Sequence, residues 1–357
     1  MATWPAKINY ATGDVLTAAQ MNDIGGELND LYTSSGFAAG KNKILNGDFG
    51  IWQRGTSFNY TGSAATTYTA DRFAVYVNGN GTYTISQQTF TAGTAPVAGY
   101  EGQYFCRFAT NTVGTSTQAI AFDQRIEDVR TFAGQTITVS FWAKADSARN
   151  ITPYIAQNFG SGVSATVQTS LGTTGITTSW VRYSFTTTLA SISGKTIGTS
   201  SYLNFYISLT PAASQTIDIW GVQVEAGSVA TPFQTATGTK QGELAACQRY
   251  YWRAVSGGSY GLLGISGYVV NSTTANINVN YPVFMRTIPT SVDYSTLTIQ
   301  DSAASLYAVS AASINTDITN NYAAGLNITI SGATSGRWAR MLANNSTNAY
   351  IGFSAEL

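Results

Sequence analysis

The residues that come nearest to a catalytic arrangement are three acids close together in the sequence, Asp123, Glu127 and Asp128. Sugar hydrolysis uses two carboxylates that lie about 5–9 Å apart across the substrate. Arg125 and Arg130 lie among these acids, so a solvated turn with salt bridges explains the pattern better than an acid/base pair. The sequence contains no histidine, the commonest general base and the commonest zinc ligand. We therefore expect no enzymatic activity and no cofactor.

Aromatic residues that alternate with polar ones offer a different chemistry, which is sugar binding. Trp142 shares one face of its expected strand with Lys144. In the same way, Trp180 shares one face of its expected strand with Arg182 and Ser184. An aromatic ring packs against the CH face of a sugar, and polar neighbours bond its hydroxyls. Alternatively, the two tryptophans cover the edge of a sandwich or contact a neighbouring subunit, because aromatic residues are also enriched at oligomer interfaces. The candidate glycan-binding residues are Trp142, Tyr154, Trp180, Arg182 and Tyr206.

The composition indicates a β-protein with an uncharged surface. Charged residues make up 10% of the 357 residues, against roughly 25% in an average soluble domain. Thr, Ser, Asn and Gly take their place, which is typical of short strands and tight turns. The formal net charge of zero argues against nucleic acid as a partner. No apolar run is long enough to insert in a membrane, and the N-terminus lacks the apolar core of a signal peptide, so we expect synthesis in a cytoplasm without general export.

The two cysteines, Cys106 and Cys247, are far apart in the sequence. Two small buried apolar side chains are the simpler interpretation, and one long-range disulfide is the alternative.

Runs of alternating residues predict many short strands separated by turn-forming clusters. Because no helical pattern separates them, they indicate an antiparallel sandwich or jelly roll. We expect a mainly β chain, with a short N-terminal helix, a jelly-roll β-sandwich over residues 41–238 and a second β-sandwich domain over residues 239–357. Residues 239–253 are a further helix candidate, although their end could equally begin a strand. The expected strands are 82–87, 104–108, 119–126, 135–145, 151–157, 180–187, 202–209, 217–224, 267–270, 275–281, 295–300, 326–330 and 350–357.

The stretch 217–227 is expected to close the first sandwich. Ile217 and Ile219 fall on one face of a strand, and Gly221 in mid-run indicates a bulge. Its best partner lies far upstream, at residues 42–55. We therefore predict that these two stretches lie side by side.

Residues 1–40 are expected to form a separate segment. A helix beginning after Thr17 would place four apolar residues at spacings of 3, 4 and 3, which is the seam of a coiled coil. A helix this short is marginal alone. It therefore either docks or self-associates, or it packs on its own domain. The seam residues are Met21, Ile24, Leu28 and Leu31.

A set of short segments carries a recognisable pattern: residues 11–24, 44–58, 70–73, 140–144, 220–227 and 230–233, with 248–252 and 285–289 in the C-terminal part. These segments resemble bacteriophage tail fibres and related virion-surface proteins. The resemblance implies a homotrimer in the virion whose N-terminal segment binds other virion proteins and whose body binds host surface polysaccharide. A capsid head fibre and a glycan-cleaving tailspike are the alternatives that the same resemblance leaves open.

The middle of the chain also resembles carbohydrate-binding modules of the jelly-roll type. The resemblance lies in Asn46-Gly47-Asp48-Phe49 and in Asp218 of the closing strand. It implies a structural calcium between Asp48 and Asp218. Gly50 stands where these modules usually have a glutamate, so one ligand would be missing. Alternatively, Asp48 caps a turn and Asp218 hydrogen-bonds to a neighbouring loop.

Overall fold

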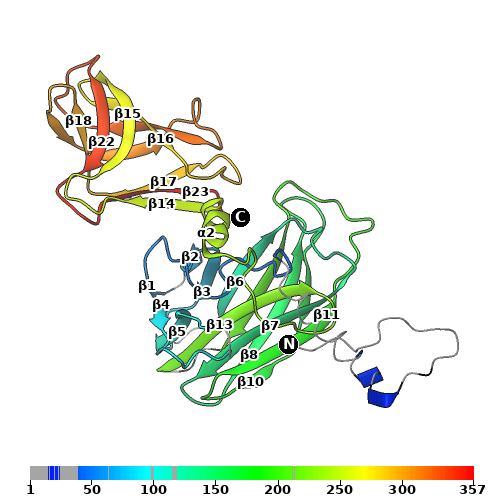
Figure 1. Cartoon of the computed structure of the whole chain (residues 1–357). Helices are drawn as coiled ribbons and strands as arrows, with labels where there is room; N and C mark the ends of the chain where they lie inside the picture. The colour runs from blue at the N-terminus through cyan, green and yellow to red at the C-terminus, as the bar shows by residue number, and fades with distance from the viewer. Residues whose placement is uncertain are drawn as a thin grey trace.

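The computed structural model describes residues 39–357, apart from 63, 98–99, 115–118, 211 and 213. It also describes residues 15, 17–19, 21–22 and 24 of the N-terminal segment. The described chain is mainly β, with two β bodies on either side of a short helix (Figure 1). The predicted fold class is confirmed. Within the described part, no helix is long and apolar enough to cross a membrane.

The first body contains two antiparallel sheets, which we call sheet 1 and sheet 2. Neighbouring strands are often distant in sequence, as in a jelly roll. Sheet 1 has the order β1 (Ser57–Thr61), β4 (Thr82–Thr89), β5 (Tyr104–Thr112), β13 (Gln215–Ala226), β7 (Thr136–Ala145), β11 (Val181–Thr188). Sheet 2 has the order β10 (Thr174–Ile176), β8 (Arg149–Asn158), β12 (Tyr202–Leu209), β6 (Ala119–Glu127), β3 (Phe73–Asn78), β2 (Ala64–Tyr68), with β9 (Val167–Ser170) on β8.

The core of this body lies between the inner faces of the two sheets. Along β12 every second side chain is buried, which leaves the alternate residues on the outer face of sheet 2. Phe73 and Phe122 stack in the core with ring centroids 4.8 Å apart. Phe141 of sheet 1 and Phe205 of sheet 2 meet across it at 6.2 Å. Aromatic pairs of this kind add stability beyond the area that they bury.

The stretches near residues 45 and 220 lie side by side, as predicted. The amide of Val222 donates to the carbonyl of Gly47 at 2.9 Å. The side chain of Asn42 donates to the carbonyl of Val222 at 3.1 Å and accepts from the amide of Val224. Gly221 has φ of +65°, where the register of β13 against β7 shifts. The predicted bulge is therefore confirmed, and Gly supplies the left-handed backbone that it needs.

The second body has a three-stranded and a seven-stranded sheet around a separate core. Residues 295–300 were expected to be one strand, but Thr296, with φ of +56°, divides them between two sheets. The small sheet has the order β14 (Tyr251–Val255), β23 (Tyr350–Ser354), β17 (Ser291–Ser295). The large sheet has the order β19 (Leu306–Ala308), β18 (Leu297–Asp301), β22 (Trp338–Ala343), β15 (Leu262–Asn271), β16 (Thr274–Asn280), β21 (Ala323–Thr329), β20 (Ala311–Ile314).

A helix, α2 (Lys240–Gln248), links the two bodies and is followed by β14, so both alternatives for residues 239–253 are realised in turn. Thr239 caps it, accepting from the amide of Gly242 at 3.1 Å. The helix buries Glu243 and Cys247. Cys106 and Cys247 are both buried free thiols, which confirms the simpler interpretation of the two cysteines.

Part of the N-terminal segment is helical. Residues 18, 19, 21, 22 and 24 have helical backbone, and the amide of Met21 donates to the carbonyl of Thr17 at 3.0 Å. Met21 and Ile24 are 55% and 37% exposed. The other two seam residues, Leu28 and Leu31, lie outside the described residues.

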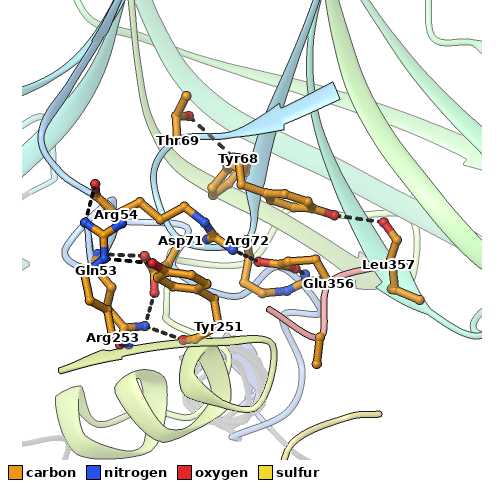
Figure 2. Close-up of polar contacts among 12 residues, drawn as sticks. Gln53, Arg54, Tyr68, Thr69, Asp71, Arg72, Tyr251, Arg253, Glu356 and Leu357 are labelled. Carbon is orange, nitrogen blue, oxygen red and sulfur yellow. Dashed lines mark hydrogen bonds and ion pairs between the residues drawn. The ribbon is translucent and has the colours of Figure 1, made fainter. Parts of the chain in front are cut away.

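The two bodies share a polar junction (Figure 2). The side chain of Gln53 donates to the carbonyl of Tyr251 at 2.7 Å, and Arg253 donates to the carbonyl of Arg54 at 2.9 Å. The Arg54 guanidinium lies 3.5 Å from the ring centroid of Tyr251. Because each contact joins residues about 200 positions apart, the junction holds the second body against the loops of the first.

Candidate functional site

The five candidate glycan-binding residues do not form one surface. Trp142 and Arg182 belong to β7 and β11 of sheet 1, and Trp180 directly precedes β11. Tyr154 and Tyr206 belong to β8 and β12 of sheet 2. The five residues therefore do not line the same sheet.

Trp142 is only 7% exposed, so it offers no ring face to a sugar. Its ring centroid lies 5.3 Å from that of Trp220 and 6.2 Å from that of Phe233. The Arg182 guanidinium lies 4.6 Å from the Trp142 ring centroid, and it donates to the carbonyl of Thr231 at 2.5 Å. The chain that leaves β13 packs over this part of sheet 1. Trp142 therefore packs within the sandwich, which agrees with the alternative interpretation of the tryptophans.

Trp180 belongs to the same aromatic cluster. Its ring centroid lies 5.4 Å from those of Phe90 and Phe105, and the Lys144 ammonium lies 5.3 Å from it. It is partly buried against the core. Its role is therefore packing on the outer side of sheet 1.

The pair Asp48 and Asp218 does not fit a calcium ion. Both carboxylate oxygens of Asp218 accept from Arg107, at 2.7 and 2.8 Å, and Lys144 lies 3.7 Å away. Asp48 instead accepts from the hydroxyl of Tyr100 at 2.9 Å. Two cations already neutralise Asp218, and among the described residues no three acidic, Cys or His side chains form a metal cluster.

The outer face of sheet 2 does bring aromatic and polar side chains together. Strand register places Tyr206 directly between Asp123 of β6 and Tyr154 of β8, and Ser170 of β9 continues the row. The rings of Tyr154 and Tyr206 stack, with centroids 4.8 Å apart and planes 9° from parallel. Both rings are half-buried, so part of this aromatic platform is exposed to solvent.

A second row runs parallel to the first and consists mainly of hydrogen-bonding groups. Asn204 lies between Arg125 and Ala156, and Gln168 follows on β9. Because alanine is small, Ala121 and Ala156 leave the sheet surface open. The result is a hollow of about 260 Å³. It is lined by Thr66, Tyr76, Ala121, Asp123, Arg125, Ala156, Asn158, Thr166, Gln168, Tyr202, Asn204 and Tyr206.

Asp123 is the acidic group of this hollow, and its side chain is almost inaccessible. Burial raises its pKa to about 6, although Arg125 and Arg72 favour the carboxylate. The Nε of Arg125 lies 3.6 Å from one Asp123 oxygen. The Asn204 amide, oriented so that its NH₂ faces acceptors, donates to the same oxygen at 3.2 Å. Asp123 is nevertheless among the residues that line the hollow.

Burial also raises the pKa of Tyr206 to about 12, and the neighbouring Tyr154 adds to the rise. Tyr206 therefore stays a neutral hydroxyl that can both donate and accept at physiological pH. The Arg125 guanidinium lies 5.0 Å from the ring centroid of Tyr202, which holds it at the edge of the hollow. Together these groups form a fixed set of donors and acceptors beside the tyrosine platform.

Sequence reasoning identified Tyr154 and Tyr206 but missed Asp123, Gln168 and Tyr202 as neighbours. Asp123 was assigned to a solvated turn, whereas it lies within β6. The sequence of β6 could have revealed Asp123. Asp123 and Arg125 alternate with the core residue Phe122, so they fall on the opposite face of the strand.

No family model matches the chain, and no curated protein matches it. Among solved structures, a carbohydrate-binding module described under "CBM4 structure and function" is 22% identical with a TM-score of 0.31, and the match covers 52% of this chain and 99% of that one. The enzymatically active domain of tailspike protein 4 of bacteriophage CBA120 is 15% identical with a TM-score of 0.32, over 52% of this chain and 22% of that one. TmCBM61, solved with β-1,4-galactotriose, is 11% identical with a TM-score of 0.30, over 52% and 99%. These TM-scores are too low to assign a site.

Proposed function

We propose that this protein binds glycans on the outer face of sheet 2. The observation that carries the proposal is the stacked pair Tyr154 and Tyr206, in register with Asp123 and next to Asn204. A sugar ring has apolar CH groups on its faces and hydroxyls around its rim. A tyrosine platform bordered by an amide and a carboxylate matches both.

The polar groups of the hollow suit neutral hydroxyls better than a phosphate or a charged peptide. Arg125 is the basic residue of the lining, and Asp123 lies beside it. Nucleic acid needs a basic surplus, and the chain as a whole has a formal net charge of zero. Gln168, Asn158 and Asn204 instead line the hollow with uncharged amides.

A glycan array tests this proposal, and a reducing-end assay on every bound polysaccharide tests the absence of catalysis. We expect binding to some glycans with no release of reducing ends. Absence of binding to every glycan would contradict the binding proposal. Release of reducing ends would contradict our expectation of no enzymatic activity and favour the tailspike alternative.

We further propose that the protein is a virion-surface fibre, a tail fibre of a bacteriophage, that acts as a homotrimer. The support is the sequence resemblance and the exposure of Met21 and Ile24 on the helical N-terminal residues. Repeated weak sites gain avidity in a trimer without new contacts.

Light scattering should give three times the monomer mass for the full chain, whereas a monomer at micromolar concentration would contradict the trimer. Electron microscopy of antibody-labelled particles would separate tail fibre, capsid head fibre and no virion location.

A further inference from the structure

A second and larger cavity lies in the first body, where the loops around residues 48–53 and 100–104 meet the start of α2. Its volume is about 660 Å³, which is in the range of small-molecule sites. None of its lining residues lines the hollow on sheet 2. We call it the junction cleft.

Aromatic side chains form one part of the cleft, and Trp52 and Tyr100 are held in place by contacts with the residues behind them. The indole N–H of Trp52 donates to the carbonyl of Phe49 at 2.7 Å, and the Trp52 ring stacks on Phe58 at 6.4 Å. The ring of Tyr100 packs against Trp220, with centroids 5.7 Å apart. Tyr104 also lines the cleft. A ligand would therefore meet rings that are already ordered, which lowers the entropic cost of binding.

Carboxylates form another part of the cleft. Asp48 accepts from the Tyr100 hydroxyl at 2.9 Å, and Glu101 accepts from a neighbouring backbone amide at 2.7 Å. Glu243 accepts from the amide of Asn46 at 2.8 Å. Burial raises the pKa of Glu243, and the nearby carboxylate of Asp48 adds to the rise. The other Glu243 oxygen accepts from the amide and the hydroxyl of Thr237, at 3.1 and 2.8 Å. Asp48 and Glu101 are therefore the carboxylates left to attract a bound cation.

The charge of the lining is unbalanced. Three acids are among its lining residues, and Lys240 is the single basic side chain among the described residues that line it. An ammonium group would be attracted both to the carboxylates and to the faces of the aromatic rings. Hydroxyls of the same ligand would donate to the carboxylate oxygens that remain free.

We infer that the junction cleft binds a sugar that carries a protonated amine, and that it prefers this amino sugar to the neutral parent sugar. This inference uses residues separate from those of the proposed function, so either can fail without the other.

Calorimetric titration of the full chain at pH 7 with glucosamine, glucose and N-acetylglucosamine tests the inference. We expect glucosamine to bind at least about tenfold more tightly than the two neutral sugars. We expect added salt to weaken the binding of glucosamine alone, because the preference is electrostatic. Equal affinity for the three sugars, or no binding of any, would overturn the inference.

Two substitutions locate the site, one expected to weaken the binding of glucosamine and one expected to strengthen it. Asp48→Asn keeps an acceptor for the Tyr100 hydroxyl but removes a charge, so we expect several-fold weaker binding of glucosamine. Lys240→Gln removes the competing cation, so we expect several-fold tighter binding. Asp128 is an exposed acid outside the cleft. Asp128→Asn is therefore the matched control and should leave the affinity for glucosamine unchanged. If either cleft variant behaves like this control, glucosamine binds elsewhere.

Tyr206→Ala separates the two sites. It should leave the affinity for glucosamine unchanged, because Tyr206 lines the sheet 2 hollow and not the cleft. Loss of glucosamine binding in this variant would assign that binding to sheet 2 and would overturn the inference for the cleft.

Discussion

Arg72 of the first body and Glu356 of the second form an ion pair that is almost completely buried at the junction (Figure 2). Their side chains are 2% and 6% exposed. The Arg72 guanidinium also lies 3.5 Å from the ring centroid of Tyr250, and it donates to the carbonyl of Arg125 at 2.5 Å. The junction therefore contains a charge that can exist there only while its partner is present.

Glu356→Gln should destabilise the protein by about 3 kcal/mol, because it removes the carboxylate that is paired with the buried Arg72 charge. Thermal and denaturant unfolding measure the change. The control is Asp128→Asn, which breaks the exposed pair between Asp128 and Arg130 and should cost less than about 1 kcal/mol. Equal stabilities of the two variants would show that the junction pair does not hold the bodies together.

Asp71 should make stability depend on pH. Its carboxylate accepts from the backbone and side chain of Gln53, and burial raises its pKa from 3.8 to about 6 although Arg54 favours the charged form. The folded state therefore binds the proton more tightly than the unfolded state. The stabilisation is fully present below the unfolded pKa and is lost as pH rises through the folded pKa.

Asp71→Asn removes this titration. Relative to the wild type, the variant should gain about 2.5 kcal/mol of stability between pH 4 and pH 7, since each pKa unit corresponds to about 1.4 kcal/mol. Unfolding of both proteins across this range measures the difference, and groups common to both cancel. A constant difference across the range would show that Asp71 is not shifted.

Gly47 should tolerate no side chain, because the seam between residue 47 and β13 is too close. A Cβ there would lie 2.2 Å from the carbonyl oxygen of Val222. Gly47→Ala should cost about 2 kcal/mol or more, since the bonded backbone must move. At Gly50 the nearest atom would lie at an ordinary 3.5 Å, so Gly50→Ala should be nearly neutral. Similar stabilities of the two variants would contradict the geometry of the seam.

Much of the fold could be predicted, because the alternation of apolar and polar residues within a strand indicates which face of that strand is buried. The alternation in residues 202–209 and the bulge at Gly221 appear in the structure as expected. Short edge strands such as β2 and β20 were missed, because runs rich in Thr, Ser and Ala carry little hydrophobic pattern. The long-range partner of Arg72 was also missed, because Glu356 lies 284 residues away in the sequence.

The site was harder to predict than the fold, because it depends on register between strands. Tyr154 and Tyr206 are 52 residues apart in sequence and become partners only when β8 pairs with β12. The burial of Trp142 depends on Phe233, in the chain that leaves sheet 1. The alternation of apolar and polar residues within one strand shows neither the pairing of the two tyrosines nor the burial of Trp142.

Glycan binding should depend on the ionisation of Asp123. Since the pKa of Asp123 is about 6, its carboxylate should accept from sugar hydroxyls at pH 7 and be largely protonated at pH 5. We expect affinity to fall several-fold as pH drops across this range. Asp123→Asn should bind with an affinity that does not change between pH 5 and pH 7. A variant that keeps the wild-type pH dependence would exclude Asp123 from the site.

The central claim is that the stacked tyrosines of sheet 2 bind sugar, and calorimetry with Tyr206→Ala tests it most directly. The titrant is the glycan that binds best on the array. Tyr268→Ala is the matched control, because Tyr268 is 51% exposed and lies on β15 of the second body. We expect affinity to fall at least about tenfold, or about 1.4 kcal/mol, in Tyr206→Ala and to stay unchanged in the control. Unchanged affinity in a correctly folded Tyr206→Ala would contradict the claim.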